Sequence, residues 1–168
     1  SAATTPERNL PLILWNQRWE YDKNPEAFFR AILALAREGI PFELAVCGES
    51  FQQPPEIFDR AARQLNSHVI HWGHARQDLY RRLLWEATLT VSTALHEFFG
   101  ISILEAAFCH TLPLVPNRLS YPEILPPEFH EPCLYHGEAE LLERLKRALA
   151  DPQSTRETAQ ALSTQIGI

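Results

Sequence analysis

Short apolar segments alternate with longer segments of helical periodicity along nearly the whole chain. The segments that we expect to form strands are residues 10–15, 41–48, 69–73, 88–93, 112–115 and 133–135. The expected helices are residues 25–38, 56–65, 78–87, 138–149 and 154–166, with a further helix that begins near Gly100. This alternation predicts an α/β fold, a Rossmann-like, doubly wound parallel sheet of about six strands with helices on both faces.

The helix after the first strand carries its own boundary signals. Asn24 is suited to cap it, Pro25 fits its first position, and Gly39 fits the residue after its end. Residues 117–127, in contrast, are rich in proline and are expected to be irregular.

The size and composition are those of one globular domain. With 168 residues, 45% of them apolar and 21% charged, we expect a single domain over residues 10–168, preceded by a linker or expression remnant over residues 1–9. The formal net charge of −6 argues against non-specific nucleic-acid binding by this domain alone. No apolar stretch approaches the ~20 residues that span a bilayer, and no signal peptide is evident. Cys47, Cys109 and Cys133 lie in apolar segments, so we expect reduced thiols and a cytoplasmic protein.

Polar loops follow three of the expected strands. They are residues 16–24, Gly48 with Glu49, and residues 96–100. In a doubly wound parallel sheet, ligands bind beyond the carboxyl ends of the strands, where loops meet helix N-termini. We therefore expect the three loops to form one ligand site that includes Gly48. His96 is expected to donate a hydrogen bond to a substrate hydroxyl in this site.

The segment from Ser92 to His110 is the most informative of these regions. A strand, a loop containing Gly100 and a helix that starts there form an anion site, because the first backbone N–H groups of a helix have no partner within it. We expect a phosphate group to lie against this helix start. The residues around it are Phe99, Gly100, Ile101 and Ser102.

Two glutamates frame this helix start, Glu97 in the loop and Glu105 further along the helix. Glycosidases place paired carboxylates across a scissile bond. These two, however, lie at different depths of one strand–loop–helix turn, which better suits binding two parts of one ligand. A phosphate at the helix start would leave Glu105 near sugar hydroxyls and Glu97 facing the group that the phosphate carries. The arrangement predicts a nucleotide-sugar pocket.

Arg18 and Lys23 lie in the first strand-to-helix loop, on the ligand side of the sheet. A diphosphate leaving group gains negative charge as the glycosidic bond breaks, and either a divalent cation or fixed cations can compensate that charge. The sequence has no Asp-x-Asp pair or carboxylate cluster suited to magnesium. We therefore expect Arg18 and Lys23 to stabilise the leaving group, with no metal and no other cofactor.

Other chemical patterns are weak. His68, His71 and His74 are closely spaced, but side chains alternate between the faces of a strand, so a zinc site is not expected. His71 and His74 are expected at the rim of the pocket. No Ser-His-Asp order, nucleophile elbow or GxGxxG after a strand is present, and hydride transfer with a dinucleotide is disfavoured.

Residues 97–105 resemble the E-x-F-G-x-x-x-x-E signature of the family-4 retaining glycosyltransferases. Arg18 and Lys23 match the R-x-x-x-x-K of that family's first loop, although the glycine that usually precedes the arginine is Gln17 here. The family's P-V-V and P-E elements are matched by residues 113–115 and 122–123. The resemblance covers roughly residues 10–150 and implies the C-terminal half of a GT-B glycosyltransferase, which has two facing Rossmann-like halves.

Residues 15–29, 92–106 and 116–124 are more narrowly similar to the glycosyltransferases that attach mannose to queuosine in tRNA. This similarity implies that the chain is a donor-binding half whose nucleotide sugar is GDP-mannose. It also implies two partners, an N-terminal acceptor domain of the same full-length protein and, for the full-length enzyme, tRNA. The isolated half is expected to bind the nucleotide with little or no transfer.

The same resemblance implies roles for four charged residues. Arg18 and Lys23 would contact the donor diphosphate, Glu105 the ribose hydroxyls, and Glu97 the donor sugar. Gln17 in place of the glycine is the departure from the family pattern at this loop.

Two other hypotheses stay open at this point. The first is a non-catalytic interaction module that keeps the fold without binding a nucleotide. The charged residues at the ligand side of the sheet argue against it. The second is a phosphorylase or an epimerase on the same architecture, which would need a pyridoxal lysine or a different acid–base set. Lys146, in an amphipathic helical segment, is a poor candidate for that lysine.

Overall fold

The computed structural model describes residues 9–49, 53–96 and 99–167, so the predicted linker lies almost wholly outside the described residues. The strands are β1 (Leu12–Trp15), β2 (Glu43–Cys47), β3 (Val69–Gly73), β4 (Leu89–Val91), β5 (Leu112–Pro116) and β6 (Leu134–Tyr135). The helices are α1 (Pro25–Arg37), α2 (Ile57–Gln64), α3 (Gln77–Glu86), α4 (Ile101–Phe108), α5 (Tyr121–Ile124), α6 (His130–Cys133), α7 (Gly137–Ala150) and α8 (Pro152–Ile166). None of these described helices is long and apolar enough to cross a membrane.

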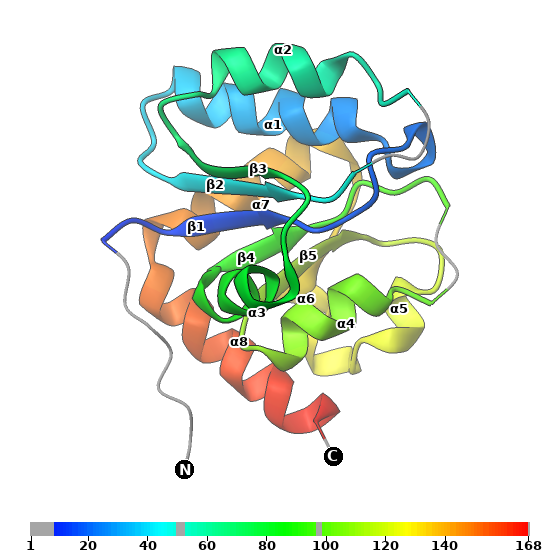
Figure 1. Ribbon diagram of the computed structural model, residues 1–168. Coiled ribbons are helices and arrows are strands. Elements are labelled where there is room, and N and C mark those ends of the chain that lie inside the picture. Colours follow the sequence, from blue (N-terminus) through cyan, green and yellow to red (C-terminus); the bar gives the residue numbers. More distant parts are fainter. Residues whose placement is uncertain (1–8, 50–52, 97–98, 168) are drawn as a thin grey trace.

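The six strands form one parallel sheet in the order β3-β2-β1-β4-β5-β6. The chain builds one half outward from β1, then returns to the other side of β1 for β4 to β6. Figure 1 shows α1 and α2 on one side of the sheet and α3, α4 and α8 on the other. The predicted doubly wound α/β fold is therefore confirmed. Its order reverses where Ile13 of β1 pairs with Leu89 of β4, and a ligand crevice is expected beyond these strands.

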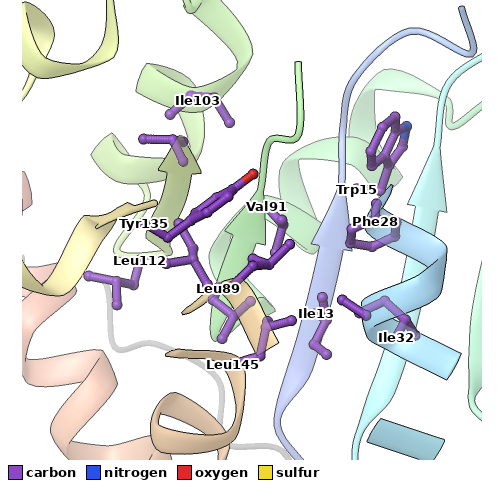
Figure 2. Close-up of a cluster of buried hydrophobic side chains, with 14 of the residues drawn as sticks. Ile13, Trp15, Phe28, Ile32, Leu89, Val91, Ile103, Leu112, Tyr135 and Leu145 are labelled. Atoms are coloured by element: carbon purple, nitrogen blue, oxygen red, sulfur yellow. The ribbon is translucent and has the colours of Figure 1, made fainter. Parts of the chain in front are cut away.

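The core explains why the central strand β1 is apolar without interruption. All four residues of β1 are fully buried, because helices cover both faces of the sheet. Ile13 and Trp15 face one layer, where they pack with Phe28 and other residues of α1 (Figure 2). Leu12 and Leu14 face the opposite layer, together with leucines of α3.

Two helix ends differ from the sequence prediction. Asn24 does precede α1, but its backbone is left-handed (φ 51°) and its side chain makes no capping hydrogen bond. Its carbonyl instead accepts a hydrogen bond of 2.7 Å from Thr93 Oγ1. The last helix begins at Pro152, ahead of the predicted Ser154, because the Asp151 carboxylate accepts from the Ser154 N–H at 3.1 Å and caps the helix there.

The segment 117–127, predicted to be irregular, contains the short helix α5 and the start of a 3-10 turn, Pro127–Phe129. The prolines do not prevent these turns, because a proline in the first turn of a helix lacks only an N–H that would be unpaired there. Tyr121 of α5 is buried and its hydroxyl lies 2.8 Å from Ser92 Oγ, which ties the segment to the end of β4.

Arg156 of α8 joins the ends of two helices on one side of the sheet. Its guanidinium donates to the carbonyls of Trp85, Glu86 and His110, each at 3.1 Å. We expect Arg156→Met to lower the free energy of unfolding by about 2 kcal/mol, because a charged donor is lost and helix C-terminal carbonyls are left unpaired. Chemical denaturation followed by circular dichroism measures this, with the exposed Arg63→Met on α2 as the control. Equal stabilities of the two variants would contradict the prediction.

Candidate functional site

A cavity of about 520 Å³ lies where the loop after β1 meets α3 and the start of α4. This is the crevice beside the reversal of strand order, and its volume is typical of small-molecule sites. The residues that line it are Asn16, Gln17, Arg18, Glu20, Asp22, Lys23, Tyr80, Phe99, Ile101, Ser102 and Glu105.

Six of the residues singled out from the sequence meet in this cavity. They are Arg18, Lys23, Phe99, Ile101, Ser102 and Glu105. Gly48, His96 and Gly100 are not part of its lining. Glu97 lies outside the described residues, so its expected role at the donor sugar stays a prediction.

The start of α4 supplies the wall that suits an anion. Gly100 precedes the helix with a φ of 63°, and a Cβ atom there would lie 3.1 Å from Ile124 Cδ1, so the left-handed turn and the tight packing both favour glycine. Ile101 and Ser102 follow as the first two helical residues and line the cavity. The unpaired N–H groups of a first helical turn are ordinary anion ligands.

The two cations of the loop after β1 are held differently. The Lys23 side chain is only 13% exposed, and its Nζ donates to the backbone carbonyl of His96 at 3.0 Å. The Arg18 side chain is 72% exposed, and its guanidinium lies 3.9 Å from Glu20. Lys23 is thus fixed against the loop after β4, whereas Arg18 is open to the solvent.

Carboxylates share this cavity with the cations. Glu20 and Asp22 lie between Arg18 and Lys23 in the sequence, and Asp22 is 3.9 Å from the Lys23 amino group. Sequence reasoning overlooked both, although they occupy the loop that it had selected. An anionic ligand has to compete with these carboxylates for the two cations.

A hydrogen-bonded group of neutral side chains was also overlooked. Asn16 and Tyr80 belong to none of the motifs found in the sequence. The Asn16 amide nevertheless contacts the Tyr80 hydroxyl at 3.2 Å, and that hydroxyl contacts Glu105 at 3.3 Å. Burial raises the pKa of Tyr80 to about 12, so the hydroxyl keeps its proton at neutral pH. The only sequence signal for Asn16 was its position directly after a buried strand.

Gln17 occupies the position where the glycosyltransferase signature has glycine. Its side chain is buried, and its Nε2 donates to Ser102 Oγ at 2.9 Å, at the start of α4. Its carbonyl accepts from Trp15 Nε1 at 2.9 Å, which anchors the loop to the core. The larger residue therefore fits by bonding to the helix start. Both hydrogens of the Gln17 amide are then used, because Nε2 also donates to Asn16 Oδ1 at 3.3 Å.

The residues that precede Glu97 are anchored from two sides. The N–H of Leu95 donates to the Asp22 carbonyl at 2.7 Å, on the side of the loop after β1. From the other side, the Arg118 guanidinium donates to the Ala94 carbonyl at 2.9 Å. The loop immediately before Glu97 is therefore held in place by hydrogen bonds from both sides.

Gly48 and the histidines lie away from the cavity lining. Gly48 has a φ of 121°, and a Cβ atom there would come within 2.9 Å of the Gln17 carbonyl oxygen, so glycine permits close approach of two loops. His71 contacts the Gly73 carbonyl at 3.0 Å, and His74 pairs with Glu49 at 3.4 Å. Within the described ranges, no cluster of three or more His, Cys, Asp or Glu residues could hold a metal.

Comparison with known proteins gives a consistent picture. Residues 2–165 match the family model described as glycosyl transferases group 1. The tRNA-queuosine alpha-mannosyltransferase of Drosophila melanogaster is 41% identical over 116 residues, which cover 69% of this chain and 31% of that protein. The chain thus matches about a third of that relative's length.

Solved structures show the same fold. The C-terminal domain of the glycosyl transferase group 1 family protein LpcC from Francisella tularensis superposes with a TM-score of 0.77 at 16% identity, covering 94% of this chain and 86% of that one. HepE of Anabaena, solved in complex with UDP, superposes with a TM-score of 0.72 at 18% identity, covering 94% and 44%. By the family model and the insect relative, this chain belongs to the group 1 glycosyltransferases.

Proposed function

We propose that this chain is the donor-binding domain of a retaining glycosyltransferase that holds its nucleotide sugar in the cavity described above. The observation that carries the proposal is that Arg18, Lys23, Ser102 and Glu105, contributed by two segments distant in sequence, line one cavity at the reversal point of the sheet. A helix start and two cations suit a diphosphate, and a carboxylate beside them suits sugar hydroxyls.

The proposed chemistry uses these groups on one face of the donor sugar. The acceptor hydroxyl oxygen bonds to the anomeric carbon while the bond from that carbon to the diphosphate oxygen breaks. The acceptor's proton passes to the departing diphosphate, whose growing charge Arg18 and Lys23 stabilise together with the N-terminus of α4. In this proposal Glu105 binds the ribose of the nucleotide and Glu97 contacts the donor sugar, and the resemblance to the family signature supports both roles.

The finer assignment is GDP-mannose as donor and queuosine in tRNA as acceptor. It is supported by the 41% identity to the Drosophila enzyme. In this proposal the N-terminal acceptor domain of the full-length protein faces the cavity and completes the enzyme, so the isolated domain binds the donor but transfers little sugar. A cytoplasmic location fits the three cysteines, which are free thiols. Burial raises the pKa of the Cys47 and Cys133 thiols to about 12.

Isothermal titration calorimetry with GDP, GDP-mannose and UDP-sugars, each with and without EDTA, tests the proposal. We expect GDP and GDP-mannose to bind in both conditions, because fixed cations rather than a divalent ion face the diphosphate. The alternative is a magnesium ion bound by Glu20 and Asp22, which line the same cavity as the two cations, and the titration with EDTA tests it. Binding that disappears with EDTA would contradict the metal-independent mechanism.

The same titration separates the proposal from its rival. If none of these nucleotides binds in the titration, the domain is better described as a non-catalytic interaction module that keeps the fold. Tighter binding of UDP-glucose than of GDP-mannose would leave the donor-binding function in place and overturn the choice of donor.

A further inference from the structure

The side chain of Asn16 links the end of β1 to three other elements of the fold. Its Nδ2 donates to the Ser102 carbonyl of α4 at 2.9 Å and to the Tyr80 hydroxyl of α3 at 3.2 Å. Its Oδ1 accepts from Thr90 Oγ1 of β4 at 3.0 Å and from Gln17 Nε2 at 3.3 Å. A fully bonded amide of this kind is rigid, because any rotation would break several hydrogen bonds at once.

These bonds set the direction of one proton. The Asn16 NH2 group can only donate, so the Tyr80 oxygen accepts from it. The single hydroxyl proton of Tyr80 is then directed at Glu105 Oε1, 3.3 Å away. Burial keeps that proton in place, because it raises the pKa of Tyr80 to about 12.

Glu105 is an exposed residue on α4, and its carboxylate would otherwise sample several rotamers. The bond from Tyr80 holds one carboxylate oxygen at the cavity wall. The second oxygen is left to accept hydrogen bonds from a ligand in the cavity. A carboxylate held in advance binds a diol more tightly than a mobile one, because less side-chain freedom is lost on binding.

We propose that Asn16 and Tyr80 are positioning residues that orient the Glu105 carboxylate toward the ribose 2′- and 3′-hydroxyls of the donor nucleotide. This inference rests on the proposed function, since it takes the cavity to be the nucleotide site. Neither residue needs to touch the ligand for this role. Their effect is therefore confined to ligands that carry the two ribose hydroxyls.

The experiment compares the affinities of GDP and 2′,3′-dideoxy-GDP for wild type and Tyr80→Phe, which keeps the ring and removes the hydroxyl. We expect Tyr80→Phe to weaken GDP binding by about tenfold, because the released Glu105 side chain has to be ordered when GDP binds, and to leave dideoxy-GDP within twofold. A purely structural role would weaken both ligands equally. Tyr21→Phe is the matched control, because Tyr21 is 71% exposed and lies outside the cavity lining.

Asn16→Asp supplies the second variant, because an aspartate of the same shape accepts the Tyr80 proton instead of donating. We expect Asn16→Asp to lose the preference for GDP over 2′,3′-dideoxy-GDP. The double variant with Tyr80→Phe should lose no more of this preference than either single variant. Glu105→Gln gives the reference for a pocket without the carboxylate.

The outcomes distinguish this inference from the proposed function. A wild-type protein that binds neither GDP nor UDP overturns the function and the inference together. A wild-type protein that binds GDP and dideoxy-GDP equally overturns only the ribose contact of Glu105 and the inference built on it. If wild type prefers GDP over dideoxy-GDP, and Glu105→Gln abolishes this preference while Tyr80→Phe preserves it, only the positioning role is overturned.

Discussion

Replacing Arg18 and Lys23 together with alanine is expected to weaken nucleoside diphosphate binding by roughly a hundredfold or more. Each cation would donate a charge-assisted hydrogen bond to the diphosphate, worth about 1.5–3 kcal/mol, and ~1.4 kcal/mol corresponds to a factor of ten. Calorimetry with GDP measures the change. The wild-type affinity should also fall as salt is added, whereas the double variant should respond less.

A charge-matched control separates this local effect from the general loss of positive charge. Arg37→Ala with Arg63→Ala removes the same charge from exposed positions at the ends of α1 and α2, away from the cavity lining. We expect this control to bind GDP within twofold of wild type. A double variant of Arg18 and Lys23 that does the same would show that the diphosphate lies elsewhere.

The single variants should differ in a way that the structure specifies. Lys23 packs with little exposure against the loop after β4 and donates to the His96 carbonyl, whereas Arg18 is open to the solvent and lies in a long ion pair with Glu20. Lys23→Ala should therefore loosen that loop as well as weaken GDP binding. Faster amide hydrogen exchange at Leu95 in this variant, and not in Arg18→Ala, is the expected sign.

The fold was predictable because its signal is repeated. Most strands of the sheet are short, mainly apolar runs between helical patterns, and burial on both faces makes the central strand β1 apolar throughout. The same topology explains why Arg18 and Glu105 meet, since loops at the carboxyl ends of β1 and β4 are neighbours wherever this strand order occurs. That part of the site follows from the order of elements and needs no side-chain detail.

The rest of the site depends on packing that the sequence does not express locally. Asn16 and Tyr80 lie 64 positions apart, and their contact depends on how α3 sits against the end of β1. The size of Gln17 suggests that it would obstruct the start of α4, yet its amide donates a hydrogen bond to the Ser102 hydroxyl there. The residues of α5 were missed for a related reason, because their short helix is held by a buried tyrosine rather than by periodicity.

Trp15→Ala is expected to produce the largest loss of stability, about 3–5 kcal/mol in the free energy of unfolding, because it removes a fully buried aromatic side chain. The Trp15 ring lies 4.9 Å from that of Phe28 and 6.1 Å from that of Phe58, measured between centroids, so a cavity would open between β1 and two helices. Urea denaturation followed by circular dichroism gives the value. Tyr21→Ala, at an exposed aromatic, is the control and should change stability by less than ~0.5 kcal/mol.

Trp15→Phe separates the packing of this residue from its hydrogen bond. Phenylalanine retains an aromatic ring against Phe28 and Phe58 but cannot donate to the Gln17 carbonyl, which Trp15 Nε1 contacts at 2.9 Å. We expect a smaller loss of about 1–2 kcal/mol, together with weaker GDP binding, because the loop that carries Gln17 and Arg18 loses its attachment to the core. A variant that unfolds more easily but binds GDP as tightly as wild type would mean that the loop is positioned without this bond. The core and the ligand site would then be coupled only through the strand itself.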